Sequence, residues 1–167
     1  NKSSIDSCNM LNGELDKVTH AADRSIYLYL YVDGKYGTFS TNMLEKDKLE
    51  DFILKAIDMV RMLGEDLCRT LPEAGRTAKD ARTGLELDLY DATIAESGSD
   101  IRLERTERIS IYKDLTRKWE KDGYLIADGT GHKYRLISEE CEYTESFEDN
   151  YVCDSQGFEG RHTETSF

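Results

Sequence analysis

The stretch that decides the fold runs from residue 26 to residue 40: Ile-Tyr-Leu-Tyr-Leu-Tyr-Val (26–32), Asp33-Gly34, and Lys-Tyr-Gly-Thr-Phe-Ser (35–40). Aliphatic residues alternate with tyrosines in the first run, which is the period-two pattern of a β-strand with two different faces. Asp-Gly between two such runs predicts a two-residue type I′ turn, since both central residues of that turn need a positive φ. The stretch is therefore expected to be a β-hairpin.

The expected hairpin has two chemically different faces. Counting outward from the turn gives these pairs: Leu28 with Phe39, Leu30 with Gly37, and Tyr31 with Tyr36. The aliphatic face is expected to pack on a core. The other face is a band of tyrosines, whose amphipathic rings can lie half-exposed or beneath another protein surface. Four residues form this candidate contact surface for a partner or a peptide: Tyr27, Tyr29, Tyr31 and Tyr36.

Composition and charge narrow the class of protein. The chain has 167 residues, which suits one domain covering residues 1–167 and burying roughly two-thirds of its unfolded surface. Charged residues make up 34% and hydrophobic residues 38%, as is typical of soluble globular proteins. The net charge of −12 argues against a nucleic-acid partner, because phosphate neutralisation needs clustered Lys and Arg. No apolar run reaches about 18 residues, so no membrane segment or membrane partner is predicted.

A second hairpin is expected ahead of the first. Residues 5–11 and 14–20 flank Asn12-Gly13, which is again a type I′ dipeptide. Two successive hairpins predict a four-stranded antiparallel meander over about residues 4–40. Turn geometry gives structural roles to five residues: Asn12, Gly13, Asp33, Gly34 and, near the carboxyl terminus, Gly157.

A helix is expected directly after the hairpins. Asn42 and Glu45 have the spacing of a capping box, and apolar residues then recur every three or four positions to about Glu65. This apolar stripe is expected to pack across the aliphatic face of the meander. It consists of Leu49, Phe52, Ile53, Ala56, Ile57, Val60 and Leu63.

The middle of the chain is less regular. Residues 68–99 lack firm periodicity, which is typical of a long functional loop, and residues 85–90 could form a short strand or a lid within it. Ser99-Asp100 are expected to cap a second amphipathic helix over about residues 101–121. Its stripe consists of Ile101, Arg105 (through its stem), Ile109, Tyr112, Leu115 and Trp119.

Strands are expected again in the carboxyl-terminal part. A strand at 124–127 ends in a loop, and residues 133–146 form a long strand that a turn at 146–149 reverses into 150–154. A last strand covers 158–167. The predicted fold class is therefore α+β: antiparallel β hairpins or a meander, packed with two amphipathic helices. Because the sequence stops inside the last strand, we expect a fragment of a longer protein.

No constellation of residues carries chemistry by itself. His20, His132 and His162 are isolated, without the H-E-x-x-H spacing that zinc hydrolysis needs, and no G-x-S-x-G is present. The acidic residues between 139 and 149 alternate along a predicted strand, so we expect them to form a solvated sheet face. No catalytic residue and no metal ligand is assigned, and no cofactor is expected in this chain.

The four cysteines are far apart and show no CxxC spacing. Cys141 and Cys153 could face each other across a hairpin. Free, partly buried thiols are the preferred interpretation, because disulfides are rare in cytosolic proteins.

Three segments carry a resemblance to a known family: Asn-Gly-Glu-Leu (12–15), Tyr-Val-Asp-Gly-Lys-Tyr-Gly-Thr-Phe-Ser-Thr (31–41) and Asp-Ser-Gln-Gly-Phe-Glu-Gly (154–160). With the amphipathic helix after residue 41, they resemble the amino-terminal domain of the TldD/PmbA (TldD/TldE) proteins, also labelled modulators of DNA gyrase. The form of the segment at 31–41 is more similar to the PmbA (TldE) branch. Asp154 and Gln156 depart from the usual Asn-Ser-Asn/Glu-Gly-Phe, so that turn is given a geometric role only.

The resemblance implies an α+β domain at the front of a cytosolic zinc metalloprotease that degrades or matures small or unfolded peptides. Its partners would be a TldD/TldE-type subunit, in a homodimer or heterodimer, and a peptide substrate. The zinc ligands of the family belong to TldD and lie downstream of the region matched here, so no family catalytic residue is carried onto this chain. Zinc is expected only in the full-length catalytic subunit.

Two functions remain open from the sequence. The first is a non-catalytic scaffold and peptide-chamber domain of such a metallopeptidase; whether the whole protein is an enzyme is not decided by these residues. The alternative is a non-catalytic protein-interaction domain, similar to a gyrase modulator, that uses the tyrosine face. A downstream H-E-x-x-x-H helix would mark a catalytic subunit, and its absence a PmbA-like partner.

Overall fold

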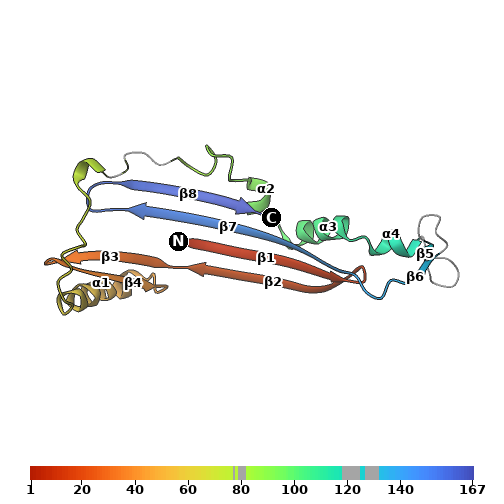
Figure 1. The fold of residues 1–167 in the computed structure, drawn as a ribbon, viewed down its shortest axis with the longest axis horizontal. Helices are drawn as coiled ribbons and strands as arrows, with labels where there is room; N and C mark the ends of the chain where they lie inside the picture. The colour runs from red at the N-terminus through yellow and green to blue at the C-terminus, as the bar shows by residue number, and fades with distance from the viewer. Residues whose placement is uncertain (77, 79–81, 118–124, 127–131) are drawn as a thin grey trace. The chain divides into compact units, whose positions relative to one another are not determined.

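The computed structural model describes residues 1–76, 78, 82–117, 125–126 and 132–167 (Figure 1). Antiparallel sheets are combined with a few helices, so the α+β class is confirmed. The chain divides into two compact units. Unit 1 comprises Asn1–Ser3, Ala22–Tyr90 and Glu148–Glu164, and unit 2 comprises Ser4–Ala21, Asp91–Phe147 and Thr165–Phe167.

The larger sheet has four strands in the order β2-β1-β7-β8 (Figure 1). Their bounds are Lys2–Leu11 for β1, Glu14–Arg24 for β2, Glu140–Cys153 for β7 and Glu159–Ser166 for β8. The predicted four-stranded meander is wrong, because β1 pairs with β7 and the next hairpin forms a separate sheet. The turn determines which two strands form a hairpin. The burial of side chains determines which further strand pairs with the edge of that hairpin. Cys8 and Met10 of β1 are each only 2% exposed, and β7 supplies the strand beside them.

The two-stranded sheet is the hairpin that the sequence predicts at residues 26–40. β3 (Ile26–Val32) and β4 (Lys35–Thr41) pair antiparallel in the expected register, with Tyr31 opposite Tyr36 and Leu30 opposite Gly37. Asp33 and Gly34 have φ values of 50° and 73°, as a type I′ turn requires. Asn12 and Gly13 at the β1–β2 turn have φ values of 52° and 76°.

The first helix, α1 (Lys46–Arg61), packs on β3 and β4 within unit 1 (Figure 1). Ala56 and Val60 are buried, and a Cβ placed on Gly37 would lie only 2.8 Å from Val60 Cγ2. The aliphatic side of the hairpin therefore faces the helix, as the stripe predicts, although Leu63 lies beyond the helix end and is exposed.

The predicted capping box is wrong. Glu45 occupies the N-cap position without a side-chain hydrogen bond to the first turn. Thr41 Oγ1 instead accepts a hydrogen bond from the Met43 amide, at 3.1 Å, so the chain makes a short connection before the helix begins.

Short elements follow in the middle of the chain. A 3₁₀ turn covers Ala74–Arg76, and residues 84–88 form turns, so the short strand considered at 85–90 is wrong. Helix α2 covers Ala92–Ala95, α3 covers Ser99–Ile109 and α4 covers Tyr112–Arg117. Strands β5 (Leu125–Ile126) and β6 (Lys133–Tyr134) pair antiparallel.

The second predicted helix is shorter than expected and begins differently. Gly98 is the N-cap of α3, and Ser99 is already helical. The helix ends because Ser110 has an extended conformation, with φ −66° and ψ 126°, and α4 begins separately at Tyr112. The predicted continuation from residue 118 to residue 121, which includes Trp119, lies outside the described residues.

Strand β7 runs without interruption from Glu140 to Cys153, so the turn predicted at residues 146–149 is wrong. Cys141 and Cys153 consequently lie on the same strand and cannot face each other across a hairpin; Cys141 is buried and Cys153 exposed, and both are free. The turn after β7 contains Gly157 at φ 92°, and the Asp154 carboxylate accepts hydrogen bonds from the amides of Gln156 and Phe158. Among the described helices, none is long and apolar enough to cross a membrane.

Candidate functional site

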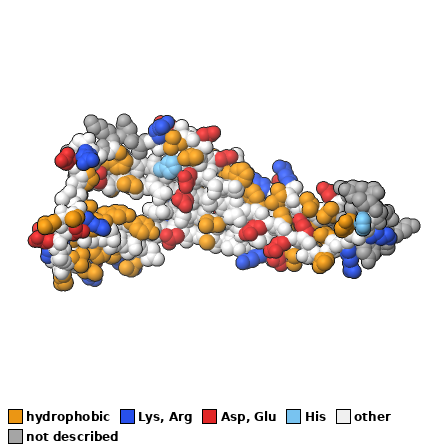
Figure 2. Space-filling model, in the orientation of Figure 1, with side chains coloured by type: hydrophobic (Ala, Val, Ile, Leu, Met, Phe, Trp, Pro, Cys, Tyr) orange, Lys and Arg blue, Asp and Glu red, His pale blue; other side chains and the backbone are white. Residues whose placement is uncertain are grey.

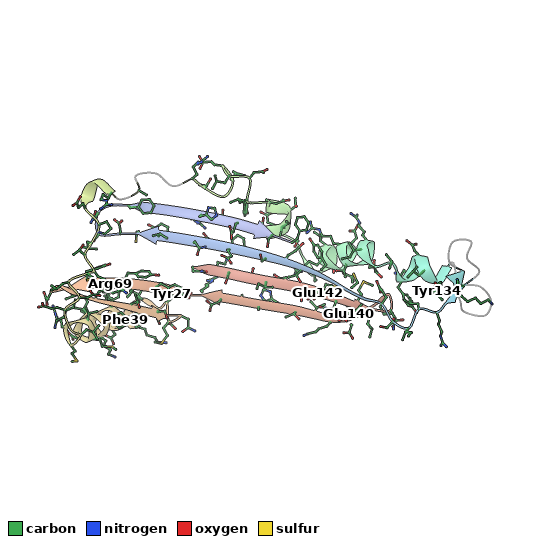
Figure 3. All side chains as sticks on the ribbon, viewed as in Figure 1. Tyr27, Phe39, Arg69, Tyr134, Glu140 and Glu142 are labelled. Atoms are coloured by element: carbon green, nitrogen blue, oxygen red, sulfur yellow. The ribbon has the colours of Figure 1, made fainter. Side chains whose placement is uncertain are left out.

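The tyrosine face of the β3–β4 hairpin is the surface that the sequence predicts. Tyr27 and Tyr29 are 58% and 67% exposed, and the rings of Tyr31 and Tyr36 lie with their centroids 4.7 Å apart. In Figure 3, Phe39 lies on the side of the hairpin that carries α1, and Tyr27 lies on the other side. Hydrophobic side chains gather on the surface formed by α1, β3 and β4 (Figure 2). The structure therefore places the four tyrosines on one accessible face.

Arg69 belongs to this face, although the sequence did not indicate it. Its guanidinium carbon lies 4.7 Å from the centroid of the Tyr36 ring, which is cation–π geometry (Figure 3). Arg69 also pairs with Asp66 at 3.2 Å, and both side chains are largely exposed. The contact depends on how the loop after α1 returns to the hairpin, and no local sequence pattern reports that path.

A second, unexpected cluster is built around Glu145 of β7, in unit 2. The Glu145 side chain is 4% exposed, so the solvated sheet face predicted for the acidic residues is wrong at this position. Oε1 accepts hydrogen bonds from Arg105 Nη1 and, at 3.0 Å, from the Tyr143 hydroxyl. Oε2 accepts one from the Ser97 hydroxyl. Glu140 and Glu142, on the same strand, are exposed as predicted (Figure 3).

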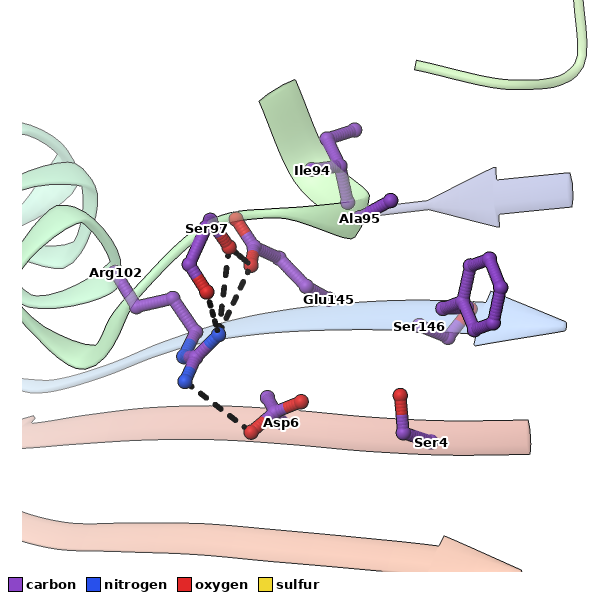
Figure 4. A pocket seen from close by; sticks show the side chains of 9 residues that line it. Ser4, Asp6, Ile94, Ala95, Ser97, Arg102, Glu145 and Ser146 are labelled. Atoms are coloured by element: carbon purple, nitrogen blue, oxygen red, sulfur yellow. Dashed lines mark hydrogen bonds and ion pairs between the residues drawn. The ribbon is translucent and has the colours of Figure 1, made fainter. Parts of the chain in front are cut away.

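Arg102 extends the cluster from α3 to β1. Its Nη2 lies 3.2 Å from Asp6 Oδ1, its Nη1 lies 3.5 Å from Glu145 Oε2, and Nη1 also donates to the Ser97 carbonyl at 2.8 Å (Figure 4). His20 Nδ1 lies 2.8 Å from the same Asp6 oxygen. Acids and bases therefore alternate from Asp6 through Arg102 and Glu145 to Arg105.

The charges of this cluster compensate one another. Burial lowers the pKa of Arg105, but hydrogen bonds to Tyr143 and Glu145 outweigh it, and the net pKa is raised. The pKa of Tyr143 is raised, first by burial and then by its bond to the Glu145 carboxylate, which favours the neutral phenol that donates. Two guanidinium groups face two carboxylates, so the cluster fastens α3 to β1 and β7. Arg102 Nε is buried without a hydrogen-bond partner among the described residues.

The buried side of α3 differs from the predicted stripe. Thr106 is fully buried; its hydroxyl donates to the Arg102 carbonyl at 2.7 Å, and its own carbonyl accepts from Cys141 Sγ at 3.6 Å. Burial raises the pKa of the Cys141 thiol, with smaller contributions from Glu139 and Cys8. Ile101 and Ile109, assigned to the stripe, are 44% and 52% exposed. The helix therefore presents a polar face to the sheet.

Two hollows adjoin the cluster. A cavity of about 50 Å³ lies beside Arg102 and Glu145 (Figure 4). An open groove of about 360 Å³ runs along α3 and is lined by Asp91, Thr93, Ile94, Arg105, Arg108, Ile109, Tyr143 and Phe167. The first is too small for more than water; the second has room for an amino-acid side chain.

No group of three or more His, Cys, Asp or Glu residues that could hold a metal ion occurs in the described part of the chain. His20 is bonded to Asp6, and His162 Nε2 lies 3.3 Å from Glu164 Oε2. These partners are those of surface histidines.

The hairpins, the packed helix and the aromatic face define an α+β domain. Residues 1–60 match the family model described as PmbA/TldA metallopeptidase domain 1. The resemblance of the chain to the TldD/PmbA family is thereby confirmed.

Among the solved structures that are similar to the chain, three illustrate the likeness. A candidate modulator of DNA gyrase from Bacteroides thetaiotaomicron is 31% identical, with a TM-score of 0.71 over 98% of this chain and 33% of its own. A candidate modulator of a DNA gyrase from Thermotoga maritima is 15% identical, with a TM-score of 0.59 over 98% of this chain and 32% of its own. TldE from Thermococcus kodakarensis is 16% identical, with a TM-score of 0.57 over 98% and 33%.

The last two likenesses show the fold alone. The chain spans about a third of the length of each of these three structures. No curated protein matches it.

Proposed function

We propose that this chain is a non-catalytic scaffold domain of a TldD/PmbA-type zinc metallopeptidase, and that it helps to admit small or unfolded peptides to a chamber formed with the rest of the protein and a partner subunit. The observation that carries the proposal is the family match of residues 1–60, whose model is described as a metallopeptidase domain. The catalytic zinc would be held by a TldD-type subunit outside this chain.

The finer points of the proposal follow from the same resemblance. The segment at 31–41 favours the PmbA (TldE) branch, so the partner would be a TldD-type subunit in a heterodimer, and the location would be the cytoplasm. The tyrosine face would contact the peptide or the partner, because Tyr27 and Tyr29 offer two adjacent exposed rings on a rigid strand.

The test uses this chain together with a TldD-type zinc subunit and an unfolded peptide. Proteolysis should require both chains, and Tyr27→Ser combined with Tyr29→Ser should raise KM about thirtyfold, since stacking on the two rings contributes about 1 kcal/mol each, or about 2 kcal/mol together. Tyr134→Ser is the matched control, because Tyr134 is 54% exposed but lies on β6. Peptide cleavage that is equally fast without this chain would overturn the proposal.

A second candidate function rests on the 31% identical structure from Bacteroides thetaiotaomicron, which is described as a candidate modulator of DNA gyrase. In this alternative the tyrosine face binds another protein and no peptide is processed. Binding of the chain to purified gyrase, abolished by the same double tyrosine variant and unaffected by a zinc subunit, would favour it over the metallopeptidase role.

A further inference from the structure

The groove along α3 is lined by both apolar and charged side chains. Of its two isoleucines, Ile94 is 8% exposed, whereas Ile109 is 52% exposed although it is aliphatic. Tyr143 and Phe167 also line it, with their ring centroids 6.4 Å apart. A side chain placed between these residues would remove apolar surface from water on both partners, at about 25 cal/mol per Å².

The two arginines of the groove are in different states. Arg105 forms an ion pair with Glu145, whose side chain is 4% exposed. Within the described part of the chain, Arg108 pairs only with Glu104, and these two side chains are 73% and 61% exposed. Exposed ion pairs contribute little, so an incoming carboxylate can replace Glu104 at Arg108 at small cost. Arg108 is therefore the accessible cation of the groove.

Asp91 supplies a hydrogen-bond acceptor to the groove. Its Oδ1 already accepts from the backbone amide and the hydroxyl of Thr93, at 2.8 and 2.7 Å, which fixes the carboxylate in place. Hydrogen bonds from Thr93 lower the pKa of Asp91, so the group is ionised at neutral pH. A carboxylate has acceptor capacity beyond these two bonds, and it suits the N–H of an amide.

We infer that this groove binds the carboxyl-terminal residue of a peptide, with its apolar side chain between Ile94, Ile109 and Tyr143 and its carboxylate on Arg108. Charge complementarity supports this occupant, because an accessible guanidinium marks the groove in a chain whose net charge is −12. A guanidinium can bind a carboxylate with two parallel hydrogen bonds. The inference rests on the proposed function, in which peptides reach this domain, and it adds that a free carboxyl end is recognised.

Three small probe molecules distinguish the contributions of the carboxylate and of the amide to binding. N-acetyl-phenylalanine carries the ring, the amide and the carboxylate; N-acetyl-phenylalaninamide lacks the carboxylate; 3-phenylpropionate lacks the amide. Binding to the full chain is followed by amide chemical shifts of residues 91–94 and 105–109. The acid should bind about fivefold more tightly than its amide, as expected for one exposed charge-assisted contact of about 1 kcal/mol. It should also bind more tightly than 3-phenylpropionate.

Two substitutions on α3 act in opposite directions. Arg108→Gln should abolish the preference for the acid over the amide, whereas Glu104→Gln should tighten binding of the acid because it removes the competing carboxylate. Arg161→Gln is the control, since Arg161 is an exposed arginine paired with Asp149, outside the groove. Unchanged thermal midpoints will show that the variants remain folded.

Equal binding of acid and amide, or shifts that ignore Arg108→Gln, would overturn the inference. Equal binding of 3-phenylpropionate would overturn the peptide as occupant and favour a free aromatic acid. If carboxylate binding in the groove is not observed while the double tyrosine variant still impairs proteolysis, the inference about the groove is wrong and the proposed function remains supported. If the groove passes and proteolysis does not need the chain, the proposed function fails separately.

Discussion

Two regions of this molecule bury a helix on strands by opposite means. In unit 1, α1 meets β3 and β4 through Ala56, Val60 and Gly37, where no side chain stands between strand and helix. In unit 2, α3 meets β1 and β7 through arginines and Thr106, while its isoleucines remain at the surface. The first interface is apolar and the second is an ion network.

The difference shows that the spacing of residues along a helix predicts the burial of apolar side chains but not that of charged side chains. An apolar side chain gains by leaving water whatever it touches, so its spacing alone marks the buried face. A charged side chain is buried only when a partner of opposite charge arrives, and here Glu145 and Arg105 are 40 residues apart. Ile101 and Ile109 were therefore misassigned to the buried face, whereas Arg105, included through its stem, does lie in the ion network.

Glu145→Gln should produce the largest loss of stability, because it leaves Arg102 and Arg105 without their shared buried carboxylate. Removing one member of a buried pair costs about 3–5 kcal/mol. Urea unfolding measures the loss. Glu142→Gln on the same strand is the control and should change the free energy of unfolding by less than about 0.5 kcal/mol. Similar values for the two variants would remove the distinction between the two regions.

Gly37→Ala tests the apolar interface. The new Cβ would lie 2.8 Å from Val60 Cγ2 and 2.9 Å from Phe39 Cε2, so α1 must shift, at a cost of about 1–3 kcal/mol. Combining it with Val60→Ala should cost less than the sum of the single changes, because the alanine vacates the space. Strict additivity in a double-mutant cycle would show that Gly37 does not hold the helix at its present distance.

Gly34→Val tests the turn that fixes the hairpin register. Gly34 has φ 73° with nothing within 4 Å of an added Cβ, so the cost comes from backbone strain alone, about 1–2 kcal/mol. Gly64→Val is the matched control, since that position is equally open and no left-handed φ is involved. Thermal unfolding of both variants decides the point; equal midpoints would contradict the strained turn.

Arg161→Gln should have the smallest effect, visible mainly in acid. Two hydrogen bonds from Arg161, each 2.7 Å, lower the pKa of Asp149, and burial opposes the shift. The contribution is present above the unfolded pKa of about 3.9 and is lost as the pH falls through the lower folded value. The variant should therefore unfold at a higher pH in an acid titration. Arg108→Gln, at an exposed pair, should leave that midpoint unchanged.

Local signals predicted the parts that depend on neighbouring residues. The register of the hairpin follows from Asp33-Gly34, and α1 follows from the spacing of Ala56 and Val60. The capping-box prediction is wrong because Asn42 and Glu45 belong to a short connection before the helix. In that connection, Thr41 Oγ1 accepts a hydrogen bond from the Met43 amide. The turn at 146–149 failed because nothing in those four residues imposes a positive φ, and pairing along β1 and β8 keeps β7 extended.

The sequence alone determined the two hairpins, the tyrosine face and the amphipathic helix, because turns and periodic burial are set within a few residues of chain. Only the tertiary structure decided that β1 pairs with β7, that Arg69 covers Tyr36, and that Glu145 is buried between two arginines. Each of these depends on which distant segment lies alongside. For a charged side chain, the neighbouring segment decides whether burial is favourable or unfavourable. The cost of removing the charge from water is compensated only when an opposite charge lies beside it.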